Sequence, residues 1–287
     1  MDVIINRRIG RVLVSQPTVE GAGVRLRRVF GYNEVPLFDP FLLLDHFGSD
    51  NPNDYIKGFP WHPHRGIETV TYMWNGEVEH GDNMGNKGVI KSGDVQWMTA
   101  GSGVIHQEMP KKYDGTMNGF QLWINLPRKK KMTAPQYRGI NKEEILTIKE
   151  KGTKIKVIAG EINGTEGPVQ CLSTPVKYFD VELEAGKIFE QAIPKSWKAF
   201  AYVVNGSVEA HDKVVMPGHV ALFTKGDLVK LASKDSAHFL FVTGEPLNEP
   251  VAWGGPIVMN TRAELSEAFK ELDEGTFIKT AKSPEAQ

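Results

Sequence analysis

Thiols are almost absent from this sequence, because Cys171 is the one cysteine in 287 residues. One thiol can form neither an internal disulfide nor a cysteine-rich zinc cluster, so a bound metal would need histidine and carboxylate ligands. Long apolar runs are missing too, and no stretch reaches the roughly 18 apolar residues of a membrane-spanning helix. The first residues lack the charge-then-apolar order of a signal peptide, and we expect a cytoplasmic protein.

An excess of charge of either sign is also lacking. The 34 Lys and Arg residues oppose 35 Asp and Glu residues, which gives a formal net charge of −1. Broad electrostatic binding to nucleic acid or to an anionic membrane needs a positive excess on one face, so the balance argues against both. One local basic run, Arg128–Lys131, is interpreted as a solvated loop, with a nuclear targeting signal as the alternative.

What the sequence does contain is a series of short β-strands. Residues Ile67–Trp74 are rich in β-branched and aromatic side chains, and Asn75-Gly76 after them predicts a tight hairpin to a return strand at Glu77–His80. Gly and Pro separate further runs at the roughly 8–12-residue spacing of a sandwich or barrel. These expected strands are Gly93–Met98, Gly119–Asn125, Lys154–Ile162, Tyr178–Glu184, Ala199–Val204, His219–Thr224 and His238–Thr243.

One helix is expected near the end of the chain. Thr261 and Glu264 have the spacing of a capping box, in which each side chain accepts a hydrogen bond from the other residue's backbone N–H. Apolar residues then recur at helical spacing, and Gly275 suits the helix end. We expect the helix to cover a sheet edge and Ser283–Gln287 to be frayed.

An internal repeat predicts two domains. Tyr72–Asp82 (YMWNGEVEHGD) and Tyr202–Asp212 (YVVNGSVEAHD) are identical at six of eleven positions, at an offset of 130 residues. The glycine-led strand that begins at Gly93 recurs at Gly218, at an offset of 125. Two copies of one supersecondary unit imply two similar β domains, with a junction near Leu126–Lys142.

Two short motifs carry the candidate chemistry. His62 and His64 flank Pro63 at the entry to a predicted strand, with Glu68 further along, and His106 precedes Glu108 by two positions. Residues two apart on a strand point to the same face, so the two pairs would converge if their strands are neighbours. Nitrogen and oxygen ligands without thiolate suit Fe, Mn, Co, Ni, Cu or Zn. The residues therefore predict a metal site.

The second copy of the repeat serves as an internal control for this site. At the two offsets, every candidate ligand is replaced while the strand signature persists, so the histidines and carboxylates are not needed to form the fold. The residues at the corresponding positions are Ala192, Pro194, Lys198, Leu231 and Ser233.

Three runs in the first half carry a resemblance to a known family. They are Phe41–Phe47 (FLLLDHF), His62–Val70 (HPHRGIETV) and Gly93–Pro110 (GDVQWMTAGSGVIHQEMP). They resemble the pirin family, whose members consist of two cupin domains with a metal in the N-terminal one. The resemblance implies an all-β fold of two tandem cupin barrels (double-stranded β-helix or jelly roll) with a short C-terminal helix. The implied domains are 1–130, which binds metal, and 131–287, which lacks metal ligands and carries the helix.

The resemblance also implies a ligand set, although five candidates compete for four places. The generic cupin carboxylate corresponds to Glu68, whereas pirins use the one at Glu108. We favour Glu108, with Glu68 orienting a histidine or Arg65, or forming a simple ion pair with Arg65. The expected metal ligands are His62, His64, His106 and Glu108.

The function implied by the resemblance is a quercetin 2,3-dioxygenase activity, in which O2 opens a flavonol with loss of carbon monoxide. The expected cofactor is one divalent metal, Fe2+ first, with Mn, Ni, Cu, Co or Zn as alternatives. Glu108 would act as base and Glu68 would be the second choice. The alternative is an iron-dependent, redox-sensing regulator that binds a protein partner. We expect a monomer that binds neither nucleic acid nor membrane directly.

Other residues near these motifs are expected to have structural roles. We expect His80 and Asp82 to serve turn chemistry, and Asp45 and His46 to be structural. A set of apolar residues on the predicted strands is interpreted as core that could also line a ligand pocket. Its members are Met73, Trp97, Met98, Phe120 and Trp123.

Overall fold

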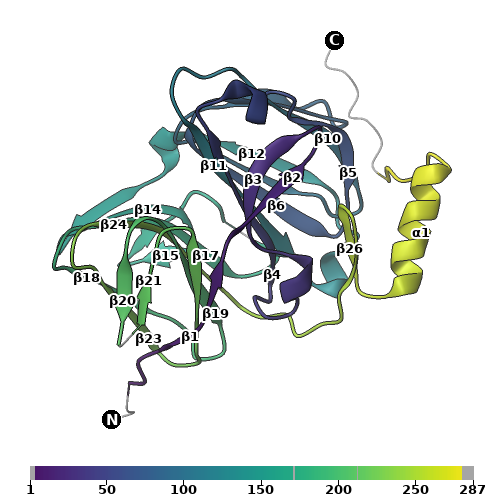
Figure 1. The fold of residues 1–287 in the computed structure, drawn as a ribbon. Helices are drawn as coiled ribbons and strands as arrows, with labels where there is room; N and C mark the ends of the chain where they lie inside the picture. The colour runs from purple at the N-terminus through teal and green to yellow at the C-terminus, as the bar shows by residue number, and fades with distance from the viewer. Residues whose placement is uncertain (1–3, 171, 212, 280–287) are drawn as a thin grey trace. The chain divides into compact units, whose positions relative to one another are not determined.

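The computed structural model describes residues 4–170, 172–211 and 213–279, so Cys171, Asp212 and Ser283–Gln287 lie outside the described residues. The chain forms two compact units, each assembled from separate stretches of sequence (Figure 1). Unit 1 consists of Met1–Gln16, Leu37–Pro40 and Glu143–Leu247. Unit 2 consists of Pro17–Pro36, Phe41–Lys142 and Asn248–Gln287.

Unit 2 is built from two antiparallel sheets, one of seven strands in the order β12-β9-β6-β11-β4-β3-β2 and one of four in the order β5-β10-β7-β8. A two-stranded sheet, β25-β26, and the helix α1 complete it. The strands are β2 (Gln16–Glu20), β3 (Val24–Phe30), β4 (Phe41–Ser49), β5 (Phe59–His64), β6 (Ile67–Asn75), β7 (Val78–Asp82), β8 (Lys87–Ile90), β9 (Val95–Thr99), β10 (Val104–Pro110), β11 (Met117–Asn125), β12 (Gln136–Ile140), β25 (Ala252–Gly254) and β26 (Ile257–Met259).

Unit 1 has the same plan. Its seven-stranded sheet has the order β1-β22-β19-β24-β17-β14-β13, its four-stranded sheet has the order β18-β23-β20-β21, and β15 pairs with β16. The strands are β1 (Ile9–Val14), β13 (Thr147–Glu150), β14 (Thr153–Ala159), β15 (Glu161–Ile162), β16 (Thr165–Glu166), β17 (Val176–Leu183), β18 (Ile188–Ala192), β19 (Lys198–Gly206), β20 (Val208–Ala210), β21 (Lys213–Val215), β22 (His219–Phe223), β23 (Leu228–Ala232) and β24 (Ala237–Gly244).

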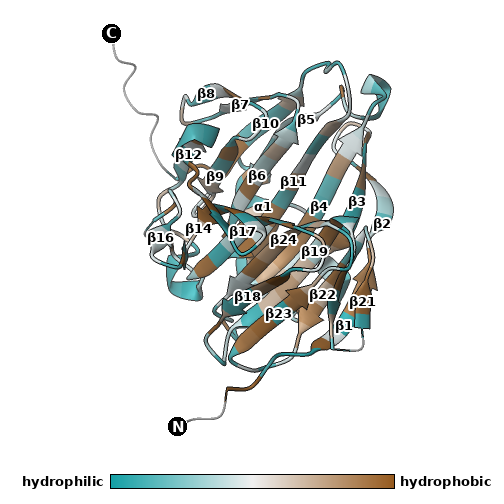
Figure 2. Ribbon diagram, turned by 90° about the vertical axis from the view of Figure 1, so that its left-hand side faces the viewer, coloured by the Kyte–Doolittle hydropathy of each residue, from teal (hydrophilic) through white to brown (hydrophobic). Residues whose placement is uncertain are grey.

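The repeat seen in the sequence is therefore a repeat of strand order. The run β9-β6-β11-β4 in unit 2 corresponds to β22-β19-β24-β17 in unit 1, and β5-β10-β7-β8 corresponds to β18-β23-β20-β21. Buried apolar side chains fill unit 1, and Figure 2 shows mainly hydrophobic residues along its strands β22 and β23. The expected all-β fold of two tandem barrels with a short C-terminal helix is confirmed.

The two units are more interleaved along the chain than the expected division into residues 1–130 and 131–287. Each large sheet takes an edge strand from outside its main run. Strand β1 from the start of the chain pairs with β22 in unit 1, and β12 from the expected junction pairs with β9 in unit 2. Residues 248–279, including the helix, also belong to unit 2. An unpaired sheet edge is a liability, and these added strands cover one edge of each large sheet.

Local signals in the sequence are confirmed for the tight turn at Gly76 and for the helix start, but the predicted hairpin is wrong. Strand β6 pairs with β9 and β11, whereas β7 pairs with β8 and β10 in the other sheet. Strand β6 ends at Asn75 and β7 begins at Val78, and Gly76 between them has φ of +102°, which a residue with a side chain rarely adopts. Helix α1 (Arg262–Asp273) begins after Thr261, whose hydroxyl accepts from the backbone N–H of Glu264, while the Glu264 carboxylate accepts from that of Thr261.

Helix α1 packs against β25 and β26 within unit 2, as Figure 1 shows for β26. Ala268 is its fully buried residue and joins Ile257, Met259 and Phe277 in a small apolar cluster. Four short 3-10 helices occur elsewhere in the described ranges, at η1 (Tyr32–Glu34), η2 (Pro52–Asp54), η3 (Arg128–Lys130) and η4 (Lys142–Glu144). Within the described part of the chain, no helix has the length and apolar character needed to cross a membrane.

Candidate metal centre

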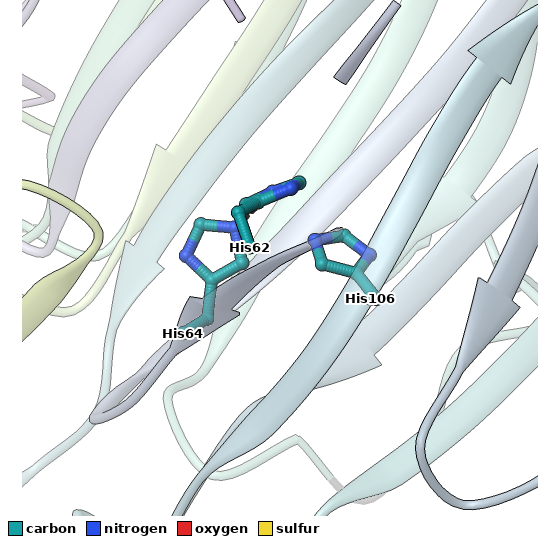
Figure 3. A group of neighbouring side chains, drawn as sticks. All are labelled: His62, His64 and His106. Carbon is teal, nitrogen blue, oxygen red and sulfur yellow. Dashed lines mark hydrogen bonds between the residues drawn. The ribbon is translucent and has the colours of Figure 1, made fainter. Parts of the chain in front are cut away.

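Three histidines meet at the junction of two strands in unit 2. His62 and His64 end strand β5, and His106 lies on β10 directly opposite His62 in the antiparallel register. The ligand-type nitrogens of the three rings all lie within 4.8 Å of one another, and Figure 3 shows the imidazoles turned toward one another. The same-face prediction for His62 and His64 is confirmed, and so is the convergence with His106.

Burial keeps two of these imidazoles neutral. His64 is 2% exposed and His106 is 0% exposed. Burial, followed by the nearby His62, lowers the pKa of His64 to about 3. Burial and the neighbouring histidines lower the pKa of His106 well below its usual range. A neutral imidazole has the lone pair that a metal ligand requires and carries no positive charge that would repel a cation.

The hydrogen bonds of His62 and His64 direct a lone pair of each ring to a common point. Nδ1 of His62 donates to the carbonyl oxygen of Pro60 at 2.8 Å, and Nδ1 of His64 donates to that of Pro256 at 3.1 Å. The two Nε2 atoms lie 3.1 Å apart. Because a neutral imidazole carries one proton, both Nε2 atoms are then acceptors and cannot donate to each other. A cation would satisfy both.

His106 supports the same conclusion independently. Neither of its ring nitrogens has a hydrogen-bond partner among the described residues, although the ring is completely buried. A buried, unsatisfied polar group costs about 1–3 kcal/mol and is rare without a functional reason. Two facing lone pairs and an orphaned imidazole are what a metal ion with nitrogen ligands would require, so the residues present fit a metal.

Glu108 lies near the histidines but is not one of the group. Its side chain is buried, and Oε1 accepts from the Thr71 hydroxyl at 2.8 Å and from Nε2 of Gln96 at 3.3 Å. Oε2 has a long contact of 3.5 Å with Nε2 of Gln121. The register of β10 against β5 shifts between His106 and Glu108. The carboxylate is thus held by neutral donors through one oxygen, and the other is less engaged.

Glu68 is bound elsewhere. Its Oε2 accepts from the Trp97 indole N–H at 3.1 Å and its Oε1 from the Thr99 hydroxyl at 2.9 Å. Burial raises the pKa of this carboxyl. The expectation that Glu68 orients or pairs with Arg65 is wrong, because the Arg65 guanidinium forms its ion pair with Glu271 at 2.7 Å. Sequence proximity suggested the first pairing, and the fold brings the second carboxylate from 206 positions further along.

A cavity of about 740 Å³ opens beside the histidines in unit 2, and His62, His64 and Glu108 are among the residues that line it. Of the apolar set from the sequence, Trp123 lines this cavity, while the other four are buried core. The aromatic walls also include residues that the sequence did not single out. Among them are Phe59, Trp61 and Trp253.

A charged cluster that sequence reasoning missed forms another part of the wall. The Arg28 guanidinium donates to both carboxylate oxygens of Asp45, at 2.9 and 2.8 Å, and pairs with Glu20 at 2.9 Å. All three residues line the cavity. Asp45 is structural, as expected, but its partner on β3 could not be found from spacing, because the register of β3 against β4 places the two residues together.

Two other expectations near the site have mixed outcomes. Asp82 serves turn chemistry, because its Oδ1 accepts from the backbone N–H of Met84 and of Asn86. His80, however, is buried with its ring 5.5 Å from that of His106, so it belongs to the surroundings of the histidine cluster. In the basic run, Arg128–Lys130 are exposed as expected, but the solvated interpretation is wrong for Lys131, which is 2% exposed.

Comparison with known proteins agrees with this architecture. A family model described as Pirin matches residues 23–124, and one described as Pirin C-terminal cupin domain matches residues 178–278. The first match contains all three histidines and Glu108.

Individual relatives match over most of their length. The chain is 45% identical to a pirin-like protein of Caulobacter vibrioides, over 94% of this chain and 99% of the relative. It is 42% identical to pirin of Mus musculus, over 93% of this chain and 92% of the relative. A crystal structure of quercetin 2,3-dioxygenase from Acinetobacter baumannii is 35% identical, with a TM-score of 0.89 over 95% of this chain and 99% of that one.

Proposed function

The chain belongs to the pirin family of two-cupin proteins, and from that premise we propose that unit 2 is a metal-dependent dioxygenase of the quercetin 2,3-dioxygenase type. The observation that carries the proposal is the pair of Nε2 atoms of His62 and His64, 3.1 Å apart, beside the unsatisfied imidazole of His106. The structural neighbour named quercetin 2,3-dioxygenase supports the reaction type.

The proposed ligands are His62, His64, His106 and Glu108. We assign one divalent transition metal, Fe2+ first, because imidazole and carboxylate without thiolate suit it; Mn, Ni, Cu, Co and Zn are the alternatives. When bound, the metal would supply a Lewis acid that favours loss of the substrate hydroxyl proton and a redox partner for O2. Glu108 would contribute Oε2, since Thr71 and Gln96 already hold Oε1.

Glu108 is also the better candidate for a general base. Its carboxylate lines the cavity, where a substrate hydroxyl would lie, and Oε2 would accept the proton when Glu108 is released from the metal or binds it loosely. Glu68 is a weaker candidate, because both its oxygens already accept hydrogen bonds from Trp97 and Thr99. The aromatic walls would orient a planar, flavonol-like substrate and exclude water from the reacting groups.

The test is direct turnover. The purified protein is loaded separately with Fe2+, Mn2+, Ni2+, Cu2+ and Co2+ and mixed with quercetin in air, while flavonol absorbance and carbon monoxide release are followed. We expect turnover with at least one metal, and its loss in a His62→Ala/His106→Ala variant. His219→Ala, in unit 1, is the matched control and should keep full activity. Absence of turnover with every metal would overturn the enzymatic proposal.

The role of the carboxylates is tested in the same assay. Glu108→Gln should lower turnover by roughly 100-fold or more, as expected for loss of a general base, whereas Glu68→Gln should have the smaller effect. The reverse order would transfer the role to Glu68. The monomeric state, the cytoplasmic location and the protein partner of the regulator hypothesis stay predictions.

A further inference from the structure

Residues 252–277, here called the return segment, lie against the strand that carries two of the histidines. They include β25, β26 and α1 and belong to unit 2. Arg65 forms a parallel bridge with Ile257, and its carbonyl oxygen accepts from the backbone N–H of Val258 at 3.1 Å. A segment far away in sequence therefore extends the backbone pairing of the metal-site strand at its end.

The approach of the two backbones is very close at Gly66. A Cβ atom built at this position would lie 2.0 Å from the carbonyl oxygen of Val258, and the φ of +78° is one that favours glycine. Buried Lys131 crosses the same place, because its Nζ donates to the carbonyl oxygens of Gly66 and Val258, each at 2.9 Å, and to Oδ1 of Asn125. These three acceptors match the three donors of an ammonium group.

The far end of the return segment is tied to the same strand by Arg65. Its Nη2 donates to the carbonyl oxygen of Phe277 at 2.7 Å, Nη1 pairs with Glu271 at 2.7 Å, and the guanidinium lies 4.1 Å from the centre of the Phe277 ring. Its Nε donates to the Ser102 carbonyl. The arginine is almost fully buried, and these charge-assisted bonds tie the return segment to the end of the strand.

The position of the return segment determines which ring nitrogen of His64 carries the proton. The turn between β25 and β26 places the Pro256 carbonyl oxygen 3.1 Å from Nδ1 of His64. A carbonyl oxygen can only accept, so the ring proton must lie on Nδ1 and the lone pair on Nε2, which faces His62. His62 obtains the same tautomer locally, from Pro60 two residues earlier, whereas His64 depends on a residue 192 positions away.

We propose that Pro256 is a positioning residue of the metal site, whose carbonyl oxygen selects the Nδ1–H tautomer of His64 and so presents Nε2 as ligand. Second partners of this kind fix the ring orientation of metal-binding histidines, and their loss typically lowers metal affinity about 10–100-fold. The inference rests on the proposed metal role of His64 but on no substrate or reaction.

The first test uses the metal-free wild-type protein with 15N-labelled histidine. Two-bond 1H–15N correlations distinguish the two tautomers of each ring. We expect His64 to carry its proton on Nδ1. A His64 ring protonated on Nε2 would overturn the proposal. Because this measurement involves neither metal nor substrate, it remains informative even if the dioxygenase assay fails.

The second test loosens the carbonyl. Pro256→Gly releases the φ restriction at the turn, and we expect mixed tautomers of His64 and a roughly 10-fold weaker affinity for Fe2+ or Co2+ by competition titration, with unchanged stoichiometry. Pro217→Gly is the control, because the Pro217 carbonyl accepts from Nδ1 of a histidine outside the metal site, His219 in unit 1, which lies two residues further along. Unchanged affinity and tautomer in the Pro256 variant would refute the positioning role, as would an equal loss in the control.

Discussion

The two units share a strand order but differ in what their small sheets carry inside. In unit 2, His106 on β10 pairs directly with His62 on β5. In unit 1, the residue at an offset of 125 from His106 is Leu231 on β23, and its partner on β18 is Phe189. Both apolar residues are fully buried. One backbone pattern thus places two imidazoles in one unit and a Phe–Leu pair in the other.

The comparison also corrects the sequence alignment of the repeats. The fixed offset of 130 made Ala192 the counterpart of His62, whereas the cross-strand partner of Leu231 is Phe189. Loop lengths differ between the copies, so no single offset holds across all strands, and register is determined by pairing. The centroids of the Phe189 and Phe241 rings lie 5.1 Å apart, and these apolar side chains offer no ligand atom for a metal. The fold tolerates either interior, and the side chains alone decide which unit has chemistry.

The largest effect should follow from grafting the unit 1 pair into unit 2. In His62→Phe/His106→Leu, we expect bound metal to fall from about one ion per chain to none, because two imidazole ligands are lost. The metal-free variant should also be more stable than metal-free wild type by about 1–3 kcal/mol, since two buried unsatisfied nitrogens disappear. Metal analysis and urea unfolding measure the two quantities.

A single substitution of another buried histidine serves as the control. His80→Phe changes a buried histidine of the surroundings, and it should weaken binding without abolishing it. Full metal content in the double variant would show that the metal lies elsewhere and would end the comparison drawn above.

The next effect is acid sensitivity of metal-free unit 2. Burial places the pKa of His64 at about 3, against 6.5 for the unperturbed group. A depressed folded-state pKa means that the unfolded state binds the proton first, so stability is complete above pH 6.5 and is lost as the pH falls toward 3. The loss is about 1.4 kcal/mol per pH unit, or about 5 kcal/mol in all from this group.

Urea midpoints measured from pH 7 to pH 4 test this. His64→Leu should remove the share that belongs to His64 and flatten the curve. Equal slopes in wild type and variant would mean that burial does not hold His64 neutral.

A third effect tests the apolar interior of unit 1. Phe189→Ala should lower the free energy of unfolding by about 3–5 kcal/mol, the usual cost of removing a buried phenylalanine, because the ring contacts Phe239 and Phe241. Metal stoichiometry should not change, since the substitution lies outside unit 2. Denaturant unfolding and metal analysis on one preparation separate the two outcomes, and a loss of metal would show that the units are energetically coupled at the site.

These contrasts show which features are readable in sequence. Local rules were sufficient for the tight turn at Gly76, the capping box at Thr261 and the shared face of His62 and His64, because turn chemistry and strand period act over a few residues. They did not show that the two strands joined by this turn enter different sheets instead of pairing as a hairpin. The two strands with their histidines could be paired only by analogy, yet the cluster with His106 forms as expected.

The features that could not be predicted all depend on long-range pairing. The carbonyl oxygen of Pro256 accepts a hydrogen bond from His64, 192 positions away in sequence. Arg65 forms its ion pair with Glu271 and not with the neighbouring Glu68. The basic run predicted a solvated Lys131, but the residue is buried, because its three hydrogen-bond acceptors come from separate parts of unit 2. Periodicity and spacing do not predict such long-range contacts, because each contact requires the register of two strands to be known first.

The smallest effect concerns a feature that unit 2 has through the return segment. Thr261→Ala removes the side-chain acceptor at the start of α1 and should lower the free energy of unfolding by about 1 kcal/mol. Metal affinity should be unchanged, because Lys131 and the Arg65–Val258 backbone bond hold the Pro256 turn upstream of the helix. Thr261→Ser, which keeps the acceptor, is the matched control. A matching fall in metal affinity in Thr261→Ala would mean that the helix, and not the turn alone, maintains His64, and the difference between the two units would then extend to the end of the return segment.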